Sequence, residues 1–143
     1  MKCMLDTSVY VGAMRSAKKR AEFTVAFTPL LPATYLAAVV AYELYINAQD
    51  RLTRRLVEEF VAPMERTSRV IAPTFSDWLG AAEVISGIEE RDRSWKSKLP
   101  ALLNDILIAL CARRVGAHLF TRNEKDFRLI RRHLEFSWTV VPA

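Results

Sequence analysis

Cysteine, histidine and glycine are all scarce in this sequence. Its 143 residues include two Cys, two His and four Gly. Cys3 and Cys111 stand in apolar runs, with no CxxC spacing and no histidine pair beside them, which disfavours a disulfide or a thiolate metal site. Neither a GxGxxG motif nor a phosphate-binding P-loop occurs. These absences argue against a thiolate metal protein and against a nucleotide-binding α/β protein.

Long hydrophobic runs are missing as well. The longest, residues 30–42, is interrupted by Pro32 and falls short of the about 20 apolar residues that span a bilayer. The first carboxylate, Asp6, comes too early to leave room for a secretory apolar segment, so we expect a cytoplasmic protein. Repeats and Gly/Ser linkers are absent too, and the length suits one compact domain over residues 1–143.

What the sequence does have is apolar residues and an excess of positive charge. Hydrophobic residues make up 51% and charged residues 26%, which is enough to build a core. The formal net charge is +5, which is compatible with a nucleic-acid partner but does not by itself define a function.

Short apolar segments alternate with helical patterns along the chain. The strand candidates are residues 2–5, 35–40, 69–72, 117–120 and 139–141. The helix candidates are residues 7–14, about 39–62 as one helix ended by Pro63, 78–85, 102–114 and 125–132, with an exposed turn at 18–20 and a helix end plus exposed loop at 89–98. Such alternation predicts an α/β fold with a parallel sheet.

Two acids are placed by the strands. Asp6 follows the first strand candidate directly, and Asp126 lies just beyond the strand candidate that ends near Phe120. Because ligand sites of parallel α/β sheets lie at the carboxyl ends of the strands, both acids are expected at the same edge.

Two further acids stand on apolar helix faces. Asp105 shares its face with Leu102 and Ile108, and Glu43 shares its face with Val40. An unpaired carboxylate on such a face costs several kcal/mol if it stays charged. A basic partner, hydrogen bonds, protonation or a metal ion must offset that cost.

Each acid also has a purely structural interpretation. Asp6 and Asp126 can be helix N-caps, and Glu43 can be a surface acid paired with an arginine. Asp105 is the hardest to explain in this way, because apolar residues flank it on both sides. Taken together, the four would form an oxygen-only site that suits Mg²⁺ or Mn²⁺ rather than Zn²⁺.

Four short motifs, in order, resemble those of PIN-domain ribonucleases. They are Leu5-Asp6-Thr7-Ser8, Tyr42-Glu43-Leu44-Tyr45, Asn104-Asp105 before Ile106-Leu107-Ile108-Ala109, and Thr121-Arg122-Asn123-Glu124-Lys125-Asp126-Phe127. The sequence is most similar to the VapC-like group, the toxins of type II toxin–antitoxin pairs. One departure is Asn47, where many relatives have a glycine. Another is that Asp126 is the acid of the fourth motif, with the neutral Asn123 at the alternative position.

The resemblance implies a PIN-like three-layer α/β/α sandwich with a short, mostly parallel sheet. It also implies an RNA-cleaving enzyme dependent on Mg²⁺ or Mn²⁺, a homodimer and an antitoxin partner. On this hypothesis Asp6 and Asp105 bind the metal. Glu43 binds a second metal or orients water, and Asp126 completes the site directly or through water. Groups that would hold the carboxylates in place are Thr7, Thr121, Asn104 and Asn123.

Two basic patches and three rival interpretations stay open. The two basic patches can contact an RNA backbone or simply be solvated helix faces. They are Lys125, Arg128 and Arg132 in one helix, and residues 15–20.

Another interpretation is that the chain is a catalytically silent PIN-like module that binds RNA or protein. A nucleotide-binding protein is disfavoured by the missing motifs, and a phosphatase-like protein by Ser8, where a second aspartate would be expected.

Overall fold

The computed structural model describes residues 1–91 and 93–142. Within this part of the chain, five short strands form one sheet in the order β3-β2-β1-β4-β5, and every neighbouring pair is parallel. The strands are β1 (Cys3–Leu5), β2 (Thr34–Ala37), β3 (Val70–Ile71), β4 (His118–Thr121) and β5 (Trp138–Val140). The predicted parallel sheet is therefore confirmed, with each strand close to its expected position.

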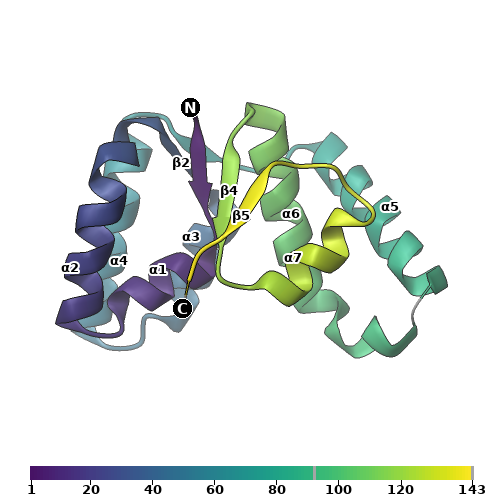
Figure 1. The fold of residues 1–143 in the computed structure, drawn as a ribbon, viewed down its shortest axis with the longest axis horizontal. Helices are drawn as coiled ribbons and strands as arrows, with labels where there is room; N and C mark the ends of the chain where they lie inside the picture. Colours follow the sequence, from purple (N-terminus) through teal and green to yellow (C-terminus); the bar gives the residue numbers. More distant parts are fainter. Residues whose placement is uncertain (92, 143) are drawn as a thin grey trace.

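Helices cover both faces of the sheet. The elements are α1 (Thr7–Met14), α2 (Ala17–Phe27), η1 (Thr28–Ala33), α3 (Ala38–Asn47), α4 (Arg51–Arg66), α5 (Phe75–Arg91), η2 (Arg93–Lys98), α6 (Leu99–Val115) and α7 (Glu124–Arg131). In Figure 1, α1, α2 and α4 lie on one side of the strands and α5, α6 and α7 on the other. The predicted three-layer α/β/α sandwich is confirmed.

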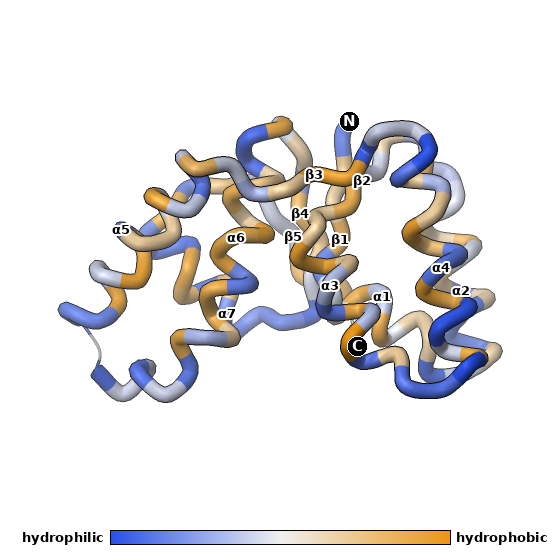
Figure 2. Tube along the Cα trace, turned by 180° about the vertical axis from the view of Figure 1, so that it is seen from behind, coloured by the Kyte–Doolittle hydropathy of each residue, from blue (hydrophilic) through white to orange (hydrophobic). Residues whose placement is uncertain are grey.

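The core is built from β1 and α6. All three residues of β1 are buried, as is the run from Ile106 to Ala112 in α6. Figure 2 shows the same trend, with hydrophobic residues gathered on the central strands and on α6, and hydrophilic ones on the outer turns. Gly116 ends α6 in the left-handed conformation, at φ 72°, which a glycine adopts without steric cost. This turn leads α6 directly into β4.

Two predictions about the amino-terminal half are wrong. Residues 18–20 are not an exposed turn but the first turns of α2, whose N-cap Ser16 accepts a hydrogen bond from the Lys19 amide at 3.0 Å. The expected single helix over 39–62 is two helices, because Asp50 caps a new helix by accepting from the Thr53 amide at 2.8 Å. Pro63 does not end α4, which continues for three more residues to Arg66.

The segment 89–98 contains the predicted helix end, but the rest of it differs from the predicted exposed loop. Helix α5 continues to Arg91 because Ile88 is buried against the core, and residues 93–98 form the 3-10 helix η2 rather than an open loop. The part of this prediction that concerns Asp92 lies outside the described residues. Residues 28–33, for which no element was expected, form η1. No helix in the described part of the chain is long and apolar enough to cross a membrane.

Candidate active site

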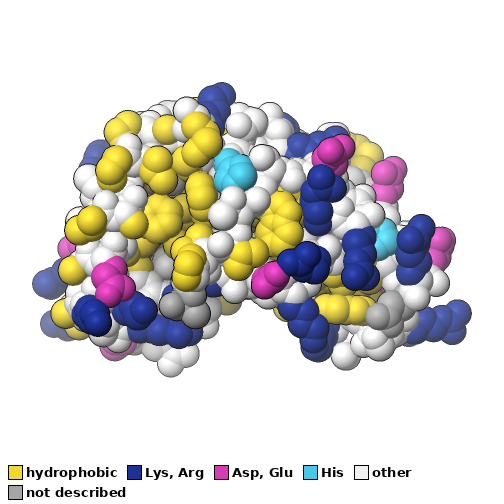
Figure 3. Space-filling model, viewed as in Figure 1, with side chains coloured by type: hydrophobic (Ala, Val, Ile, Leu, Met, Phe, Trp, Pro, Cys, Tyr) yellow, Lys and Arg dark blue, Asp and Glu magenta, His cyan; other side chains and the backbone are white. Residues whose placement is uncertain are grey.

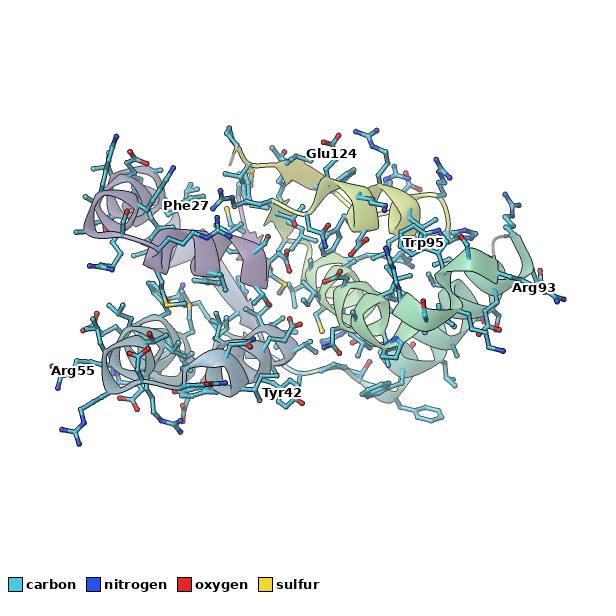
Figure 4. All side chains as sticks on the ribbon, turned by 90° about the horizontal axis from the view of Figure 1, so that it is seen from below. Phe27, Tyr42, Arg55, Arg93, Trp95 and Glu124 are labelled. Carbon is cyan, nitrogen blue, oxygen red and sulfur yellow. The ribbon has the colours of Figure 1, made fainter. Side chains whose placement is uncertain are left out.

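Parallel pairing brings two distant segments to one edge of the sheet. Leu5 of β1 lies opposite Phe120 of β4, and the Asp6 amide donates to the Phe120 carbonyl at 2.8 Å. Asp6 therefore leaves the sheet beside Thr121, at the carboxyl ends of adjacent strands. Figure 4 looks onto this edge from below, where α1, α3, α6 and α7 surround it.

Asp6 is buried and held by hydroxyl groups. Asp6 is only 3% exposed. Its Oδ2 accepts hydrogen bonds from the Ser8 and Thr121 hydroxyls, each at 2.7 Å. Asp6 occupies the N-cap position of α1 without a capping hydrogen bond from its side chain, so capping does not account for it. Burial raises the pKa of Asp6, and the Ser8 and Thr121 hydroxyls counteract this only in part.

Glu43 approaches the same edge from α3. Its Oε1 accepts a hydrogen bond from the Thr7 hydroxyl at 2.6 Å, and its Oε2 accepts one from the Asn104 amide at 3.4 Å. Among the described residues no cation pairs with this half-buried carboxylate. The interpretation of Glu43 as a surface acid paired with an arginine therefore finds no support.

Asp105 lies in the second turn of α6 and carries the clearest electrostatic signal. Burial raises its pKa, and repulsion from Asp6, Asp126 and Glu43 raises it further, to about 9. This repulsion is felt only because the four carboxyl groups lie close together. The nearest polar partner is the Asn123 side-chain amide, which donates to Asp105 Oδ2 at 3.4 Å.

Asn123 connects the last acid to the site. It is the N-cap of α7, where its Oδ1 accepts from the Asp126 amide at 3.5 Å, so the cap is not Asp126. Its Nδ2 donates to Asp126 Oδ2 at 2.9 Å, and its backbone amide donates to the Thr121 hydroxyl at 3.0 Å. One asparagine thus holds the turn after β4 and the Asp126 carboxylate in one arrangement.

The donor set suits a hard divalent cation, although the side chains are not arranged around one. Four carboxylates offer oxygen ligands only, which Mg²⁺ and Mn²⁺ prefer. Across residues 1–91 and 93–142, no three acidic, His or Cys side chains converge closely enough to form a ready metal-binding group. Side-chain rotations would be needed, but the mutual repulsion at Asp105 is what a bound cation relieves. By its chemistry the site fits the metal.

Each of the predicted supporting groups hydrogen-bonds to one of the acids. The bonds join Thr7 and Asn104 to Glu43, Thr121 to Asp6, and Asn123 to Asp105 and Asp126. Sequence reasoning missed Ser8, whose hydroxyl donates to Asp6 and accepts from the Arg122 amide at 2.9 Å. The position of Ser8 two residues after Asp6 could have predicted this hydrogen bond. We considered that position only as one where a phosphatase-like protein would have a second aspartate.

Arg122 is a second residue that sequence reasoning left out. Its guanidinium lies directly over α1 at Gly12, where a Cβ atom would stand 1.7 Å from Nη1. A side chain at position 12 would displace the guanidinium, which is the flexible end of Arg122. The guanidinium therefore lies against α1, and Arg122 forms no ion pair with any described acid.

Comparison with known proteins places the chain among related folds. The sequence model of a family described as PIN domain matches residues 3–132. A chain of VapBC2 from Rickettsia felis, bound to a DNA fragment from their promoter, is 19% identical with a TM-score of 0.67, covering 99% of this chain and 100% of that chain. VapBC-1 from nontypeable Haemophilus influenzae is 24% identical with a TM-score of 0.63, covering 98% of both chains.

A toxin–antitoxin complex from Klebsiella pneumoniae has a similar fold as well. It is 20% identical, with a TM-score of 0.56, and covers 88% of this chain and 90% of that chain. At these identities the likeness concerns the fold. No curated protein matches the chain by sequence.

Proposed function

The chain belongs to the PIN domain family, and from this premise we propose that it is a metal-dependent ribonuclease that hydrolyses RNA phosphodiester bonds. We further propose that it is the toxin of a type II toxin–antitoxin pair. The observation that carries the first proposal is the gathering of four carboxylates with no cation among the described residues to neutralise them. Such a cluster costs stability and persists where a cation is to be bound.

We assign a role to each acid from the groups that hold its carboxylate in place. Asp6 is fixed by two hydroxyls and Asp105 stands next to it on the rigid helix α6, so these two are the proposed metal ligands. A bound Mg²⁺ or Mn²⁺ would neutralise phosphate oxygens and lower the pKa of a bound water. Glu43 would bind a second metal or orient the attacking water, because Thr7 and Asn104 hold both of its oxygens.

Asp126 completes the site from α7. Its bond to Asn123 points the carboxylate toward Asp105, whose pKa it raises. We propose that Asp126 acts directly on the metal or through a water. Thr7, Thr121, Asn104 and Asn123 keep the carboxylates in place, a role to which we add Ser8.

An exposed apolar face supports the proposed homodimer. Helices α3 and α5 both lie on the face of the molecule seen in Figure 2. Both helices expose large apolar side chains. These are Tyr42 at 59%, Ile46 at 54%, Phe75 at 77%, Trp78 at 49% and Leu79 at 53%. Figure 4 shows Tyr42 pointing away from the sheet. Apolar patches of this kind mark contact surfaces, and we propose a second copy of this chain as the occupant.

The antitoxin and the location in the cell belong to the same proposal. The similar structures are VapBC proteins and a toxin–antitoxin complex, which supports an antitoxin as partner of this chain. We propose that residues 1–143 act as one PIN-like domain in the cytoplasm. The second candidate, a catalytically silent PIN-like module that binds RNA or protein, is disfavoured because all four acids are present and gathered at one edge.

The test is cleavage of a panel of RNAs with Mn²⁺ and with EDTA. We expect cleavage by the wild-type protein with Mn²⁺ alone, and its loss in Asp6→Asn. Glu65→Gln is the matched control, because Glu65 is exposed at the far end of α4 from the site. Cleavage that survives both EDTA and Asp6→Asn would refute the assignment, and RNA binding without cleavage would favour the silent module.

A further inference from the structure

A second feature of the molecule is a basic groove around Trp95. Its volume is about 420 Å³. Residues of α5, η2, α7 and the turn after α7 line it: Ile88, Arg91, Trp95, Lys125, Arg128, Leu129, Arg132 and His133. We call it the Trp95 groove. Figure 4 shows Trp95 between α7 and the end of α5, on the same side of the molecule as the edge that carries the acids.

The charge in the groove is positive and poorly compensated. None of the described lining residues is acidic, and of the cations only Arg128 has an ion pair with a described carboxylate, Glu124. His133 does not add to this charge at neutral pH, because burial and the nearby Arg91 and Arg132 hold its pKa below the usual value. Figure 3 shows Lys and Arg side chains gathered over the half of the molecule that carries α7, beside a notch in the lower outline.

Trp95 is the aromatic centre of this charge. Lys98 Nζ lies 5.4 Å and Lys125 Nζ 5.5 Å from the centroid of its ring. Neither lysine forms an ion pair with a described acid. A half-buried indole with two uncompensated ammonium groups is matched by a ligand that combines a flat ring with negative charge. A nucleotide is such a ligand, since its base can stack on the indole while its phosphate contacts the lysines.

The position of the Trp95 groove next to the acids favours an RNA strand as its occupant. Lys125 immediately precedes Asp126, so one turn of α7 faces both the carboxylates and the groove. The groove and the acids therefore share α7, which suits one RNA strand that contacts both. Stacking on Trp95 needs a base free of its own neighbours, which favours a single strand over a duplex.

We propose that the Trp95 groove binds a single-stranded nucleotide of the RNA substrate next to the cleaved phosphate, with the base on Trp95 and the backbone on Lys125 and Arg132. The proposal rests on the proposed ribonuclease function. Stacking of a base on indole is stronger than an exposed lysine contact with the same ring, so the base displaces a lysine and leaves it for the phosphate.

The test measures binding of a fluorescent, unstructured ten-nucleotide RNA by anisotropy in EDTA, where cleavage is blocked. Trp95→Leu should weaken binding about tenfold, the typical loss of one stacked base, and Trp95→Phe should retain most of the affinity. Lys125→Gln with Arg132→Gln should reduce the salt dependence of log Kd by roughly one to one and a half, as expected for two phosphate contacts with a single strand. All three variants change half-buried or exposed side chains, and far-UV circular dichroism checks that they fold.

The matched control is Lys2→Gln with Arg66→Gln. It removes the same charge at the opposite edge of the sheet, and Lys2 also lies over an aromatic ring, 5.7 Å from the centroid of Tyr35. We expect its RNA affinity to stay within twofold of wild type, roughly the effect of net charge alone. An equal loss in the control and in the groove variants would overturn the proposal, as would wild-type affinity in Trp95→Leu and Lys125→Gln with Arg132→Gln.

Two more outcomes separate this inference from the proposed function. If the groove variants lose RNA binding but the wild-type protein cleaves no RNA with Mn²⁺, the groove stands and the ribonuclease proposal fails. If the wild-type protein cleaves RNA and the groove variants cleave limiting RNA at the wild-type rate, the groove fails alone. Displacement of the RNA by an acidic dodecapeptide, but not by unlabelled RNA, would assign the groove to a protein partner and overturn the proposal.

Discussion

Helix α6 meets an acid near each of its ends, and the two acids are satisfied in opposite ways. Asp77 of α5 is buried against the last turn of α6, where its Oδ2 accepts from Arg114 Nε at 3.0 Å and from the Thr74 amide at 2.9 Å. Asp105, in the second turn of α6, has three other acids and the amide of Asn123 around it.

The difference separates an acid that stabilises the fold from one that costs stability. At Asp77 a matched cation and a backbone amide offset the loss of water, and Arg114 also donates to the Ala72 carbonyl at 2.7 Å. At Asp105 burial and like charge both oppose ionisation. The proposed binding of a cation would offset this cost at Asp105.

The largest expected effect is on catalysis. Asp105→Asn should reduce RNA cleavage with Mn²⁺ by more than about a hundredfold, because losing a ligand costs more than losing one of its hydrogen-bond partners, which costs about 10–100-fold. Asp77→Asn should cleave at the wild-type rate per folded molecule. Equal rates for the two variants, measured on the same RNA, would erase the distinction between the acids.

Stabilisation of the folded protein by Mn²⁺ should depend on Asp105 and not on Asp77. With free Mn²⁺ at a hundred times its Kd, the free energy of unfolding of the wild-type protein should rise by about 2.7 kcal/mol. Urea titration should show the same rise for Asp77→Asn and little of it for Asp105→Asn. A Mn²⁺ effect of the same size in Asp105→Asn would mean that the metal binds elsewhere.

Asp77→Asn should destabilise the protein by about 2 kcal/mol in EDTA. This is less than the about 3–5 kcal/mol for breaking a fully buried pair, because the Arg114 side chain is 36% exposed. Combining Asp77→Asn with Arg114→Gln should cost less than the sum of the single changes, since both remove the same contact. Additive losses in urea titration would show that the two side chains act independently.

The smallest expected effect is a gain in stability from Asp105→Asn, about 1 kcal/mol at pH 8 in EDTA. The pKa of Asp105 rises from 3.8 to about 9 on folding, so the folded state binds the extra proton and the wild-type protein loses stability as pH rises between these values. The gain should therefore vanish near pH 4. A gain that is the same at pH 4 and pH 8 would indicate improved packing rather than relieved charge.

Local patterns were sufficient for much of the fold. The apolar run that begins at Leu102 and the stop at Gly116 predicted α6, because helix periodicity and a left-handed glycine are local properties. Local patterns were insufficient around residues 18–20, where three consecutive basic residues led to the prediction of an exposed turn. Helix α2 forms there because Ser16 caps it and because Phe23 and Phe27 pack against the core, as does Phe60 from α4.

The presence of the four acids, the position of Asp6 directly after a strand and the position of Asp105 on an apolar helix face could all be predicted from sequence patterns. That the charges of Asp6, Glu43 and Asp126 act on Asp105 follows from the three-dimensional arrangement alone, since the four acids come from separate segments that parallel pairing and helix packing bring to one edge. The tertiary structure also decided what each acid binds. The Thr121 hydroxyl of β4 reaches the Asp6 carboxylate across 115 positions of sequence, and no pattern within a single segment records that contact.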